Sequence, residues 1–231
     1  MSVNVNTVYQ RVLAITNKEQ RGYITPQEFN YMANQAQLDI FEQYFYDLNQ
    51  FARLPGNSTE YSDMLDILEE KISLFEKIGA TVTGGITLPS DVYRLGSILY
   101  NGIDAEHITQ KDWLYIKKSP LSQPSNDFPV YLRDSETNAI KVYADSITAN
   151  ETADVTCNYI KTPAEVKWGY DTNTGLYDSD ATKTTHFELH ASEETELVVK
   201  ILAMAGIILK DPGLYQIGSA EEVKNVQQEK A

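Results

Sequence analysis

The sequence has one cysteine, Cys157, so it forms no internal disulfide and does not call for an oxidising compartment. Its longest apolar run, from Leu197 to Leu209, is interrupted by Lys200 and is shorter than the ~20 residues of a membrane-spanning helix. The start of the sequence lacks the basic and apolar regions of a signal peptide. We therefore expect a protein that is soluble and intracellular when it is synthesised, with no membrane partner.

Basic residues are scarce: 19 Lys and Arg stand against 33 Asp and Glu, for a net charge of −14. A protein that holds DNA or RNA by neutralising phosphates needs clustered Lys and Arg. Lys117 and Lys118 are too small a cluster to form such a site. An acidic surface facing DNA would repel it, so we expect no specific nucleic-acid binding.

Catalytic motifs are also absent: the sequence contains no Gly-rich phosphate loop, paired CxxC, HExxH or nucleophile elbow. We therefore expect neither an enzyme nor a cofactor. The strongest exception is His186, Glu188 and His190, which would point to one face of a strand and could bind a divalent metal. Phe187 and Leu189 fit the buried face of the same strand, so a polar outer face explains the pattern without metal. These three residues are weak candidates for a metal-dependent hydrolase.

A polar loop from Asp171 to Thr185 resembles a degraded calcium loop. Its carboxylates and amide are Asp171, Asn173, Asp178 and Asp180. The EF-hand pattern requires glycine at the sixth position and a bidentate glutamate at the twelfth, and this spacing departs from it. We therefore predict an ordinary polar loop without a bound ion.

The richest pattern is one long helix over Thr25–Phe51, opened by Thr25 as N-cap, Pro26 in the first turn and Glu28 in a capping box. One apolar stripe has helical spacing and forms an ordinary core face: Phe29, Ala33, Ala36, Ile40, Tyr44, Leu48 and Phe51. A second stripe consists of Tyr31, Leu38, Phe41 and Phe45. Two interpretations stay open: a central helix inside its own domain, or a helix between its own fold and a neighbouring subunit.

Other helices are predicted over residues 8–20, with Thr7 and Gln10 as a capping box, and over residues 60–77. Alternating or β-branched patterns predict strands over residues 93–100, 130–133, 140–144, 154–161 and 185–190. Hairpin turns are expected at Asn101–Gly102 and at residues 134–138, and a short helix from Thr109 through Ile116. A last buried helix is predicted over residues 192–210, with Ser192 as its cap.

This order predicts an α+β fold, in which an N-terminal helical layer and the C-terminal helix pack together and an antiparallel β-domain lies between them. The expected regions are residues 1–79 helical, 80–170 β-domain, 171–191 polar loop and strand, and 192–231 C-terminal helix and arm. Ser219 and Glu222 match a capping box, but Val223 and Val226 are the only sizeable anchors of the arm. It is therefore either a docking arm or a frayed tail.

Five stretches between Val8 and Pro212 carry a wider resemblance: VYQRVLAITNKEQRGYITPQEFNYMANQAQLDIFEQYF, LPSDVYRLGSILYNG, QKDWLYIKKSPL, YIKTPAEVKWGY and FELHASEETELVVKILAMAGIILKDP. Together they resemble structural proteins of tailed bacteriophages. More narrowly, they are similar to the head-to-tail connector, or ring, proteins of short-tailed phages, including the crAss-like group. No catalytic signature accompanies this resemblance.

The resemblance implies a non-catalytic virion protein of the neck or tail region, assembled in the host cytoplasm. It implies a homo-oligomeric, dodecameric ring below the portal protein, with further ring or tail proteins beneath and DNA passing through without specific binding. A ring needs two different surfaces on each subunit, and Tyr31, Leu38, Phe41, Phe45, Val223 and Val226 are the interface candidates. A tail-hub or fibre-attachment protein and a β-rich ligand-binding module are the alternatives.

Overall fold

The computed structural model describes residues 2–17, 24–53, 59–134, 139–145, 150–171, 174–180, 182–208, 216, 218–221 and 223–224. The chain divides into two compact units. The helical unit comprises Met1–Leu74 and Pro163–Ala231, and the β unit comprises Phe75–Thr162. The β unit is thus an insertion between the two parts of the helical unit.

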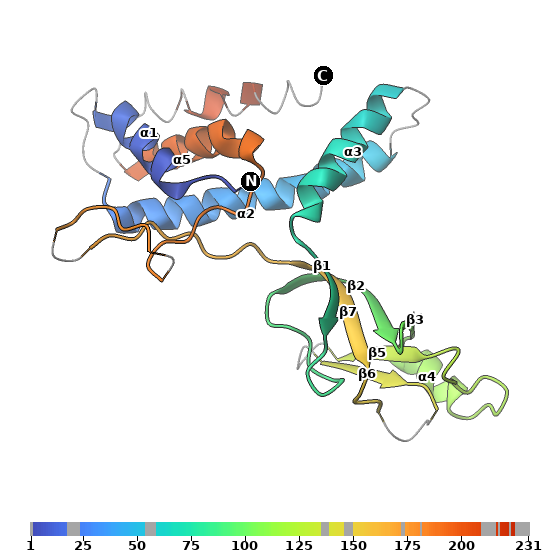
Figure 1. The fold of residues 1–231 in the computed structure, drawn as a ribbon. Helices are drawn as coiled ribbons and strands as arrows, with labels where there is room; N and C mark the ends of the chain where they lie inside the picture. The colour runs from blue at the N-terminus through green and yellow to red at the C-terminus, as the bar shows by residue number, and fades with distance from the viewer. Residues whose placement is uncertain are drawn as a thin grey trace. The chain divides into compact units, whose positions relative to one another are not determined.

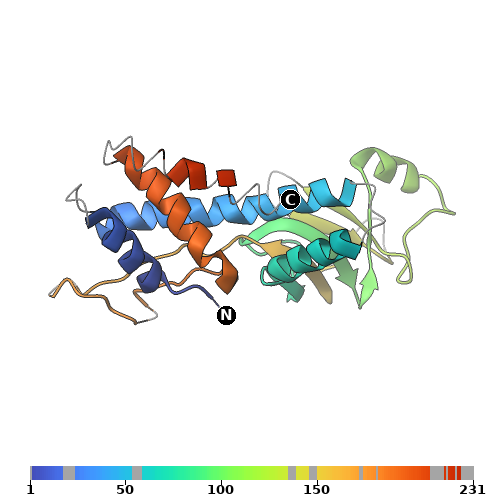
Figure 2. The ribbon, with the colours of Figure 1, turned by 90° about the horizontal axis from the view of Figure 1, so that it is seen from above.

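Within the helical unit, α5 (Glu194–Ile208) packs against α2 (Pro26–Arg53) and α1 (Val5–Asn17), while α3 (Thr59–Ser73) also packs against α2. Figure 2 shows α5 crossing the long α2, with α1 beside it. The predicted packing of the C-terminal helix on the N-terminal helices is confirmed. The density of apolar residues in α5 explains this packing, because a helix apolar around most of its circumference must be covered on several sides.

Helix α2 begins as its sequence predicts. The Thr25 N–H donates to Glu28 Oε2 at 2.8 Å, and the Glu28 N–H donates to Thr25 Oγ1 at 3.3 Å, which completes the capping box. The hydrogen bond from the Thr25 backbone, and then that from its hydroxyl, lowers the pKa of the Glu28 carboxyl. Phe29, Ala33 and Ala36 of the predicted core stripe are fully buried.

Two predicted helix starts are wrong. Helix α1 begins at Val5, because Asn4 Oδ1 accepts the N–H groups of Asn6 (2.8 Å) and Thr7 (3.4 Å) and so caps the helix earlier than Thr7 would. At the other end of the chain, a 3-10 turn (η1, Ala191–Glu193) precedes α5. His190 caps this turn, since its Nδ1 accepts the N–H of Ser192 at 3.3 Å.

The β unit contains a four-stranded antiparallel sheet in the order β1-β7-β2-β3. Its strands are β1 (Glu76–Thr81), β7 (Val155–Lys161), β2 (Val92–Tyr100) and β3 (Ile103–Asp104). Asn101 and Gly102 join β2 to β3 with φ of 50° and 80°, so the predicted tight hairpin turn is confirmed.

A second sheet of three strands has the order β4-β5-β6. It consists of β4 (Glu106–His107), β5 (Val130–Asp134) and β6 (Ala139–Tyr143). The predicted β5–β6 hairpin is confirmed as an antiparallel pair, while the short β4 pairs with β5 in parallel. Helix α4 (Gln110–Ile116) lies between β4 and β5 in sequence and is capped by Thr109, as predicted.

The two sheets share one apolar core. Its buried residues come from both: Val82, Leu88, Ile98, Ala105, Tyr131, Ile140, Val142, Val155, Cys157 and Tyr159. A backbone hydrogen bond of 2.8 Å from Ile140 N to Ile86 O also links the segment after β1 to β6. The α+β class with a central β-region is therefore confirmed (Figure 1).

The borders of the units differ from those expected at residues 79 and 170. Helix α3 ends at Ser73 rather than Lys77, because Glu76 and Lys77 already pair with β7 as part of β1. On the far side, residues 163–170 belong to the helical unit rather than to the β unit. Hydrogen bonds to α2, described below, account for this second difference.

Candidate functional site

The second apolar stripe of α2 is not a single surface. Tyr31 is 69% exposed and Leu38 is also exposed, whereas Phe41 and Phe45 are buried and meet ring to ring at 5.0 Å. Phe41 and Phe45 are therefore core residues, and their proposed place on an intersubunit surface is corrected. Their positions next to the core stripe are consistent with this burial, because both α3 and α5 pack against α2.

The candidates in the C-terminal arm are only partly described. Val223 is exposed, and Val226 lies outside the described residues. Closer to α5, Gly218 lies so near Ala203 that a Cβ on it would be 2.9 Å from the Ala203 Cα. The arm thus approaches α5 of its own chain at Gly218.

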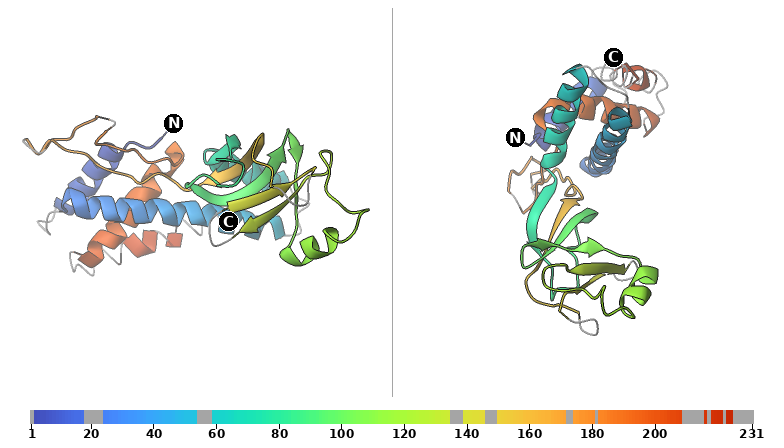
Figure 3. Two further views of the ribbon diagram at one scale, coloured as in Figure 1. Left: turned by 90° about the horizontal axis from the view of Figure 1, so that it is seen from below. Right: turned by 90° about the vertical axis from the view of Figure 1, so that its right-hand side faces the viewer.

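A row of amide side chains on α2 forms a site that the sequence analysis missed. Asn30, Asn34 and Gln37 follow one another at helical spacing and face an extended segment, residues 164–168. The Gln37 amide nitrogen donates to Ala164 O at 2.8 Å, and the Trp168 N–H donates to Asn30 Oδ1 at 2.8 Å. Figure 3 (left) shows the extended chain running along α2.

Asn34 makes the central contact of this row. Its Nδ2 donates to Val166 O at 2.9 Å, and its Oδ1 accepts the Val166 N–H at 2.7 Å. The Asn34 side chain therefore pairs with residues 164–168 as a neighbouring strand would. It satisfies the N–H and C=O groups of Val166 in place of a strand partner. The 164–168 segment, which we call the strap, is fixed to α2 in a single register.

Aromatic rings hold the end of the strap. The Trp168 ring lies 4.7 Å from Tyr9, 6.0 Å from Tyr170 and 5.7 Å from Tyr177. Its indole N–H donates to Asn6 Oδ1 at 3.1 Å. Trp168 thus links α1 to the loop that follows the strap, and it is buried with its polar atom satisfied.

The weak metal candidates lie in an extended segment held by isolated bridges rather than in a regular strand. Phe187 and Leu189 are buried, as their alternation predicts. Each polar residue has a hydrogen bond within the fold: His186 Nδ1 accepts the Val5 N–H, Glu188 Oε2 accepts the Ala164 N–H, and His190 caps η1. The three side chains therefore form hydrogen bonds that stabilise the helical unit.

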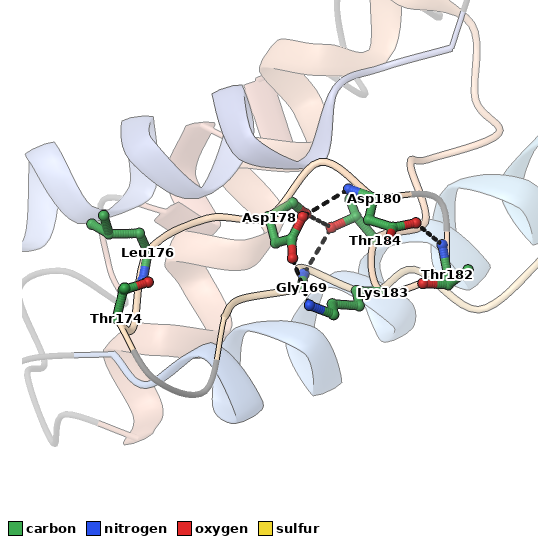
Figure 4. Close-up of polar contacts among 8 residues, drawn as sticks. All are labelled: Gly169, Thr174, Leu176, Asp178, Asp180, Thr182, Lys183 and Thr184. Atoms are coloured by element: carbon green, nitrogen blue, oxygen red, sulfur yellow. Dashed lines mark hydrogen bonds and ion pairs between the residues drawn. The ribbon is translucent and has the colours of Figure 1, made fainter.

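Figure 4 shows the polar loop after the strap. Asp178 is its centre: Oδ2 lies 2.6 Å from Lys183 Nζ, and Oδ1 accepts the Asp180 N–H at 3.1 Å. The Thr184 hydroxyl donates to Asp178 O and accepts the Gly169 N–H at 3.1 Å. The loop is therefore closed by its own side chains, in agreement with the predicted polar loop.

These contacts set the protonation of the loop. The hydrogen bond from Lys183, followed by the one from the Asp180 backbone, lowers the pKa of the Asp178 carboxyl. The same partner raises the pKa of the Lys183 ammonium. Asn173, the remaining member of the calcium-like pattern, lies outside the described residues.

Other reactive groups are enclosed in the β unit. Burial, and to a smaller extent the charge of Asp91, raises the pKa of the Cys157 thiol, which disfavours the nucleophilic thiolate. Burial and the 2.9 Å hydrogen bond to Asp91 raise the pKa of Tyr159 to about 12. Neither group is poised for chemistry near neutral pH.

A hollow of about 480 Å³ lies on the β1-β7-β2 sheet, with Asn158 among its lining residues. Asn158 already bonds on both sides, since its Oδ1 accepts the Gly79 N–H and its Nδ2 donates to Ser97 Oγ. The amide therefore ties β1 and β2 to β7, and its hydrogen-bonding groups are engaged within the sheet.

Within the described ranges, no group of three or more His, Cys, Asp or Glu side chains is arranged to hold a metal ion. In the same part of the chain, no helix has the length and apolar character needed to cross a membrane. When the chain is compared with known proteins, no family model matches it and no curated protein is significantly similar to it.

Proposed function

We propose that this protein is a non-catalytic structural subunit of a phage head-to-tail connector. It assembles into a dodecameric ring below the portal protein, with further ring or tail proteins beneath it, and surrounds the channel through which the genome leaves. The observation that carries the proposal is the resemblance of the sequence, from Val8 to Pro212, to connector proteins of short-tailed phages.

The architecture supports this proposal. The resemblance implies a helical bundle that carries a β-domain, and the helical unit with its inserted β unit has that organisation. Side chains that would attract attention as catalytic candidates, such as His186 and Glu188, are used to fix the strap and its neighbours.

Charge is also consistent with a channel protein. A net charge of −14 repels a passing polyanion, and repulsion lets DNA slide without adhering. Tyr31 and Leu38, exposed on α2, offer contact area to a neighbouring subunit, because tyrosine combines a large apolar ring with a polar tip.

Localisation in intact particles tests the proposal. We expect an antibody or affinity label on this chain to mark the neck, at one ring per particle, and the purified chain to bind a portal dodecamer. Native mass measurement of that complex gives the number of copies. Labelling of the tail tip or the fibres instead would identify a tail-hub or fibre-attachment protein and overturn the connector proposal.

A further inference from the structure

Four large apolar side chains are exposed on α4 and on the loop that connects it to β5. Leu121 is 99% exposed and Phe128 78% exposed, and Leu114 and Tyr115 of α4 are exposed as well. Scattered exposed apolar residues are normal, but this number within 15 consecutive residues of one excursion marks a contact surface. We call Leu114, Tyr115, Leu121 and Phe128, together with Lys117 and Lys118, the α4 tip.

The α4 tip is an ordered part of the β unit. Trp113 is buried and stacks on Tyr143 at 4.2 Å between ring centroids, which fixes α4 against the three-stranded sheet. Backbone hydrogen bonds in both directions between Ser125 and Phe128 close the end of the loop. Both α4 and the end of its loop are therefore held by contacts within the β unit, and Figure 1 shows α4 beside β5.

The tip also differs in charge from the rest of the chain. Residues 109–129 contain three lysines and two aspartates, a net charge of +1 in a chain of net charge −14. Lys117 and Lys118 are exposed beside the apolar residues. A partner for this tip should combine apolar side chains with carboxylates. An anionic membrane fits less well, because it would repel the rest of the protein.

Helix α3 of the helical unit carries a surface with this chemistry. At about 100° per residue, Asp66, Ile67 and Glu70 fall on one side of α3, flanked by Glu69, and Leu74 follows directly after the last helical residue. All five are exposed. Lys71 of the same helix forms its ion pair with Glu193 instead, since its Nζ lies 2.7 Å from Glu193 Oε1. We call these five residues the α3 face.

We propose that the α4 tip of one copy docks on the α3 face of a second copy of this chain. The contact joins two different surfaces, so each copy keeps one of each free for the next copy, which is the kind of contact from which rings are built. Aliphatic and aromatic side chains of the tip cover Ile67 and Leu74, while Lys117 and Lys118 meet Asp66, Glu69 and Glu70. This inference rests on the proposed function, because it names the partner surface of the homo-oligomer.

A disulfide trap tests the contact directly and captures even a weak encounter. Leu121→Cys protein is mixed with Glu70→Cys protein under mild oxidation, and the yield of crosslinked heterodimer is measured. The native Cys157 is buried and does not interfere. We expect a yield at least about tenfold above that of Leu121→Cys with Glu42→Cys, which places the second thiol on an exposed position of α2. Equal yields for the two pairs would overturn the proposal.

A charge exchange provides an independent measurement. Lys117→Glu/Lys118→Glu should lower self-association by at least about tenfold, as should Glu69→Lys/Glu70→Lys. The variant that carries all four changes should recover self-association. Lys141→Glu/Lys167→Glu changes the net charge equally at exposed positions outside the tip and serves as the control. If the four-fold variant sediments like either double variant, self-association has not been recovered. That result would contradict direct pairing of the two surfaces.

The two proposals fail separately. If the chain is found in the neck ring but the 121–70 pair does not crosslink, the ring uses other surfaces and only this inference is lost. If the pair crosslinks and the charge exchange restores association, but particles carry the chain at the tail tip, the contact stands and the connector proposal is lost.

Discussion

Asn34 pairs with Val166 through both atoms of its amide: Nδ2 donates to the Val166 carbonyl at 2.9 Å, and Oδ1 accepts the Val166 N–H at 2.7 Å. The two residues are 132 positions apart, on either side of the inserted β unit. This side chain therefore closes the helical unit across the insertion.

Replacement of Asn34 by leucine should destabilise the protein by about 2–4 kcal/mol, because both backbone groups of Val166 lose their partner in a part-buried place. Urea unfolding followed by circular dichroism measures the change. Gln35→Ala is the matched control on the next residue of α2, where the side chain contacts only the exposed Asp39 in the hydrogen bonds of this structure. Gln35→Ala should lower the free energy of unfolding by about 0.5 kcal/mol or less. Equal losses in the two variants would show that the Asn34 contact does not stabilise the fold.

Gly169→Ala should open the loop shown in Figure 4. A Cβ at this position would lie 2.5 Å from Lys183 O and 2.7 Å from Thr184 Oγ1, and the first of these atoms is backbone that must move. We expect a loss of about 1–3 kcal/mol and faster hydrogen exchange of the Asp178 amide, which donates to Gly169 O.

Gly102→Ala is the control for this glycine. Gly102 has a φ of +80° and no atom within 4 Å of an added Cβ, so alanine there introduces backbone strain without a clash. It should leave exchange of the Asp178 amide unchanged. An unchanged exchange rate in Gly169→Ala would mean that the loop tolerates the added methyl group.

The pair of Asp178 and Lys183 predicts a defined pH dependence. The pKa of Asp178 is lowered, so its contribution to stability is present above the ordinary aspartate range and is lost as pH falls through the lowered pKa. The pKa of Lys183 is raised, so its contribution is present below the ordinary lysine range and is lost as pH rises through the raised pKa. Lys183 is exposed and Asp178 is partly exposed, so salt should weaken the effect.

Carbon-detected NMR titration of Asp178 measures this interaction. Lys183→Met should move its pKa upward, because the first cause of the lowering is the hydrogen bond from Lys183. Lys141→Met, at an exposed position in the β unit, should leave the titration of Asp178 unchanged. An Asp178 midpoint that is the same with and without Lys183 would contradict the contact.

Substitutions in the buried and exposed parts of the second stripe on α2 should change the free energy of unfolding by very different amounts. Phe41→Ala removes a fully buried ring and should destabilise the fold by about 3–5 kcal/mol. Tyr31→Ala changes an exposed side chain and should leave unfolding within about 0.5 kcal/mol of the parent. If Tyr31 contacts a neighbouring subunit, native mass spectrometry of the assembled ring should show weaker association. Normal assembly of Tyr31→Ala would remove this residue from the interface candidates.

Local signals in the sequence predicted many elements well. Thr25 and Glu28 form the capping box of α2, Thr109 caps α4, and Asn101–Gly102 makes the β2–β3 turn, because each depends on residues only a few positions apart. Helix starts were wrong where a competing cap lay nearby, as at Asn4 and His190. Strand β1 was assigned in part to a helix, because its pairing with β7 is not a local property.

Composition, caps and periodicity were enough to predict a capped, two-sided helix, a β-rich middle, a strongly acidic balance and the absence of catalytic motifs. The core stripe of that helix was predicted, but the division of its second stripe into buried and exposed residues depends on the tertiary packing. It buried Phe41 and Phe45, left Tyr31 exposed, and turned Asn30, Asn34 and Gln37 into the row that holds the strap. The physical reason is that helical spacing fixes which residues share a face, while the partner that covers a face comes from distant parts of the chain.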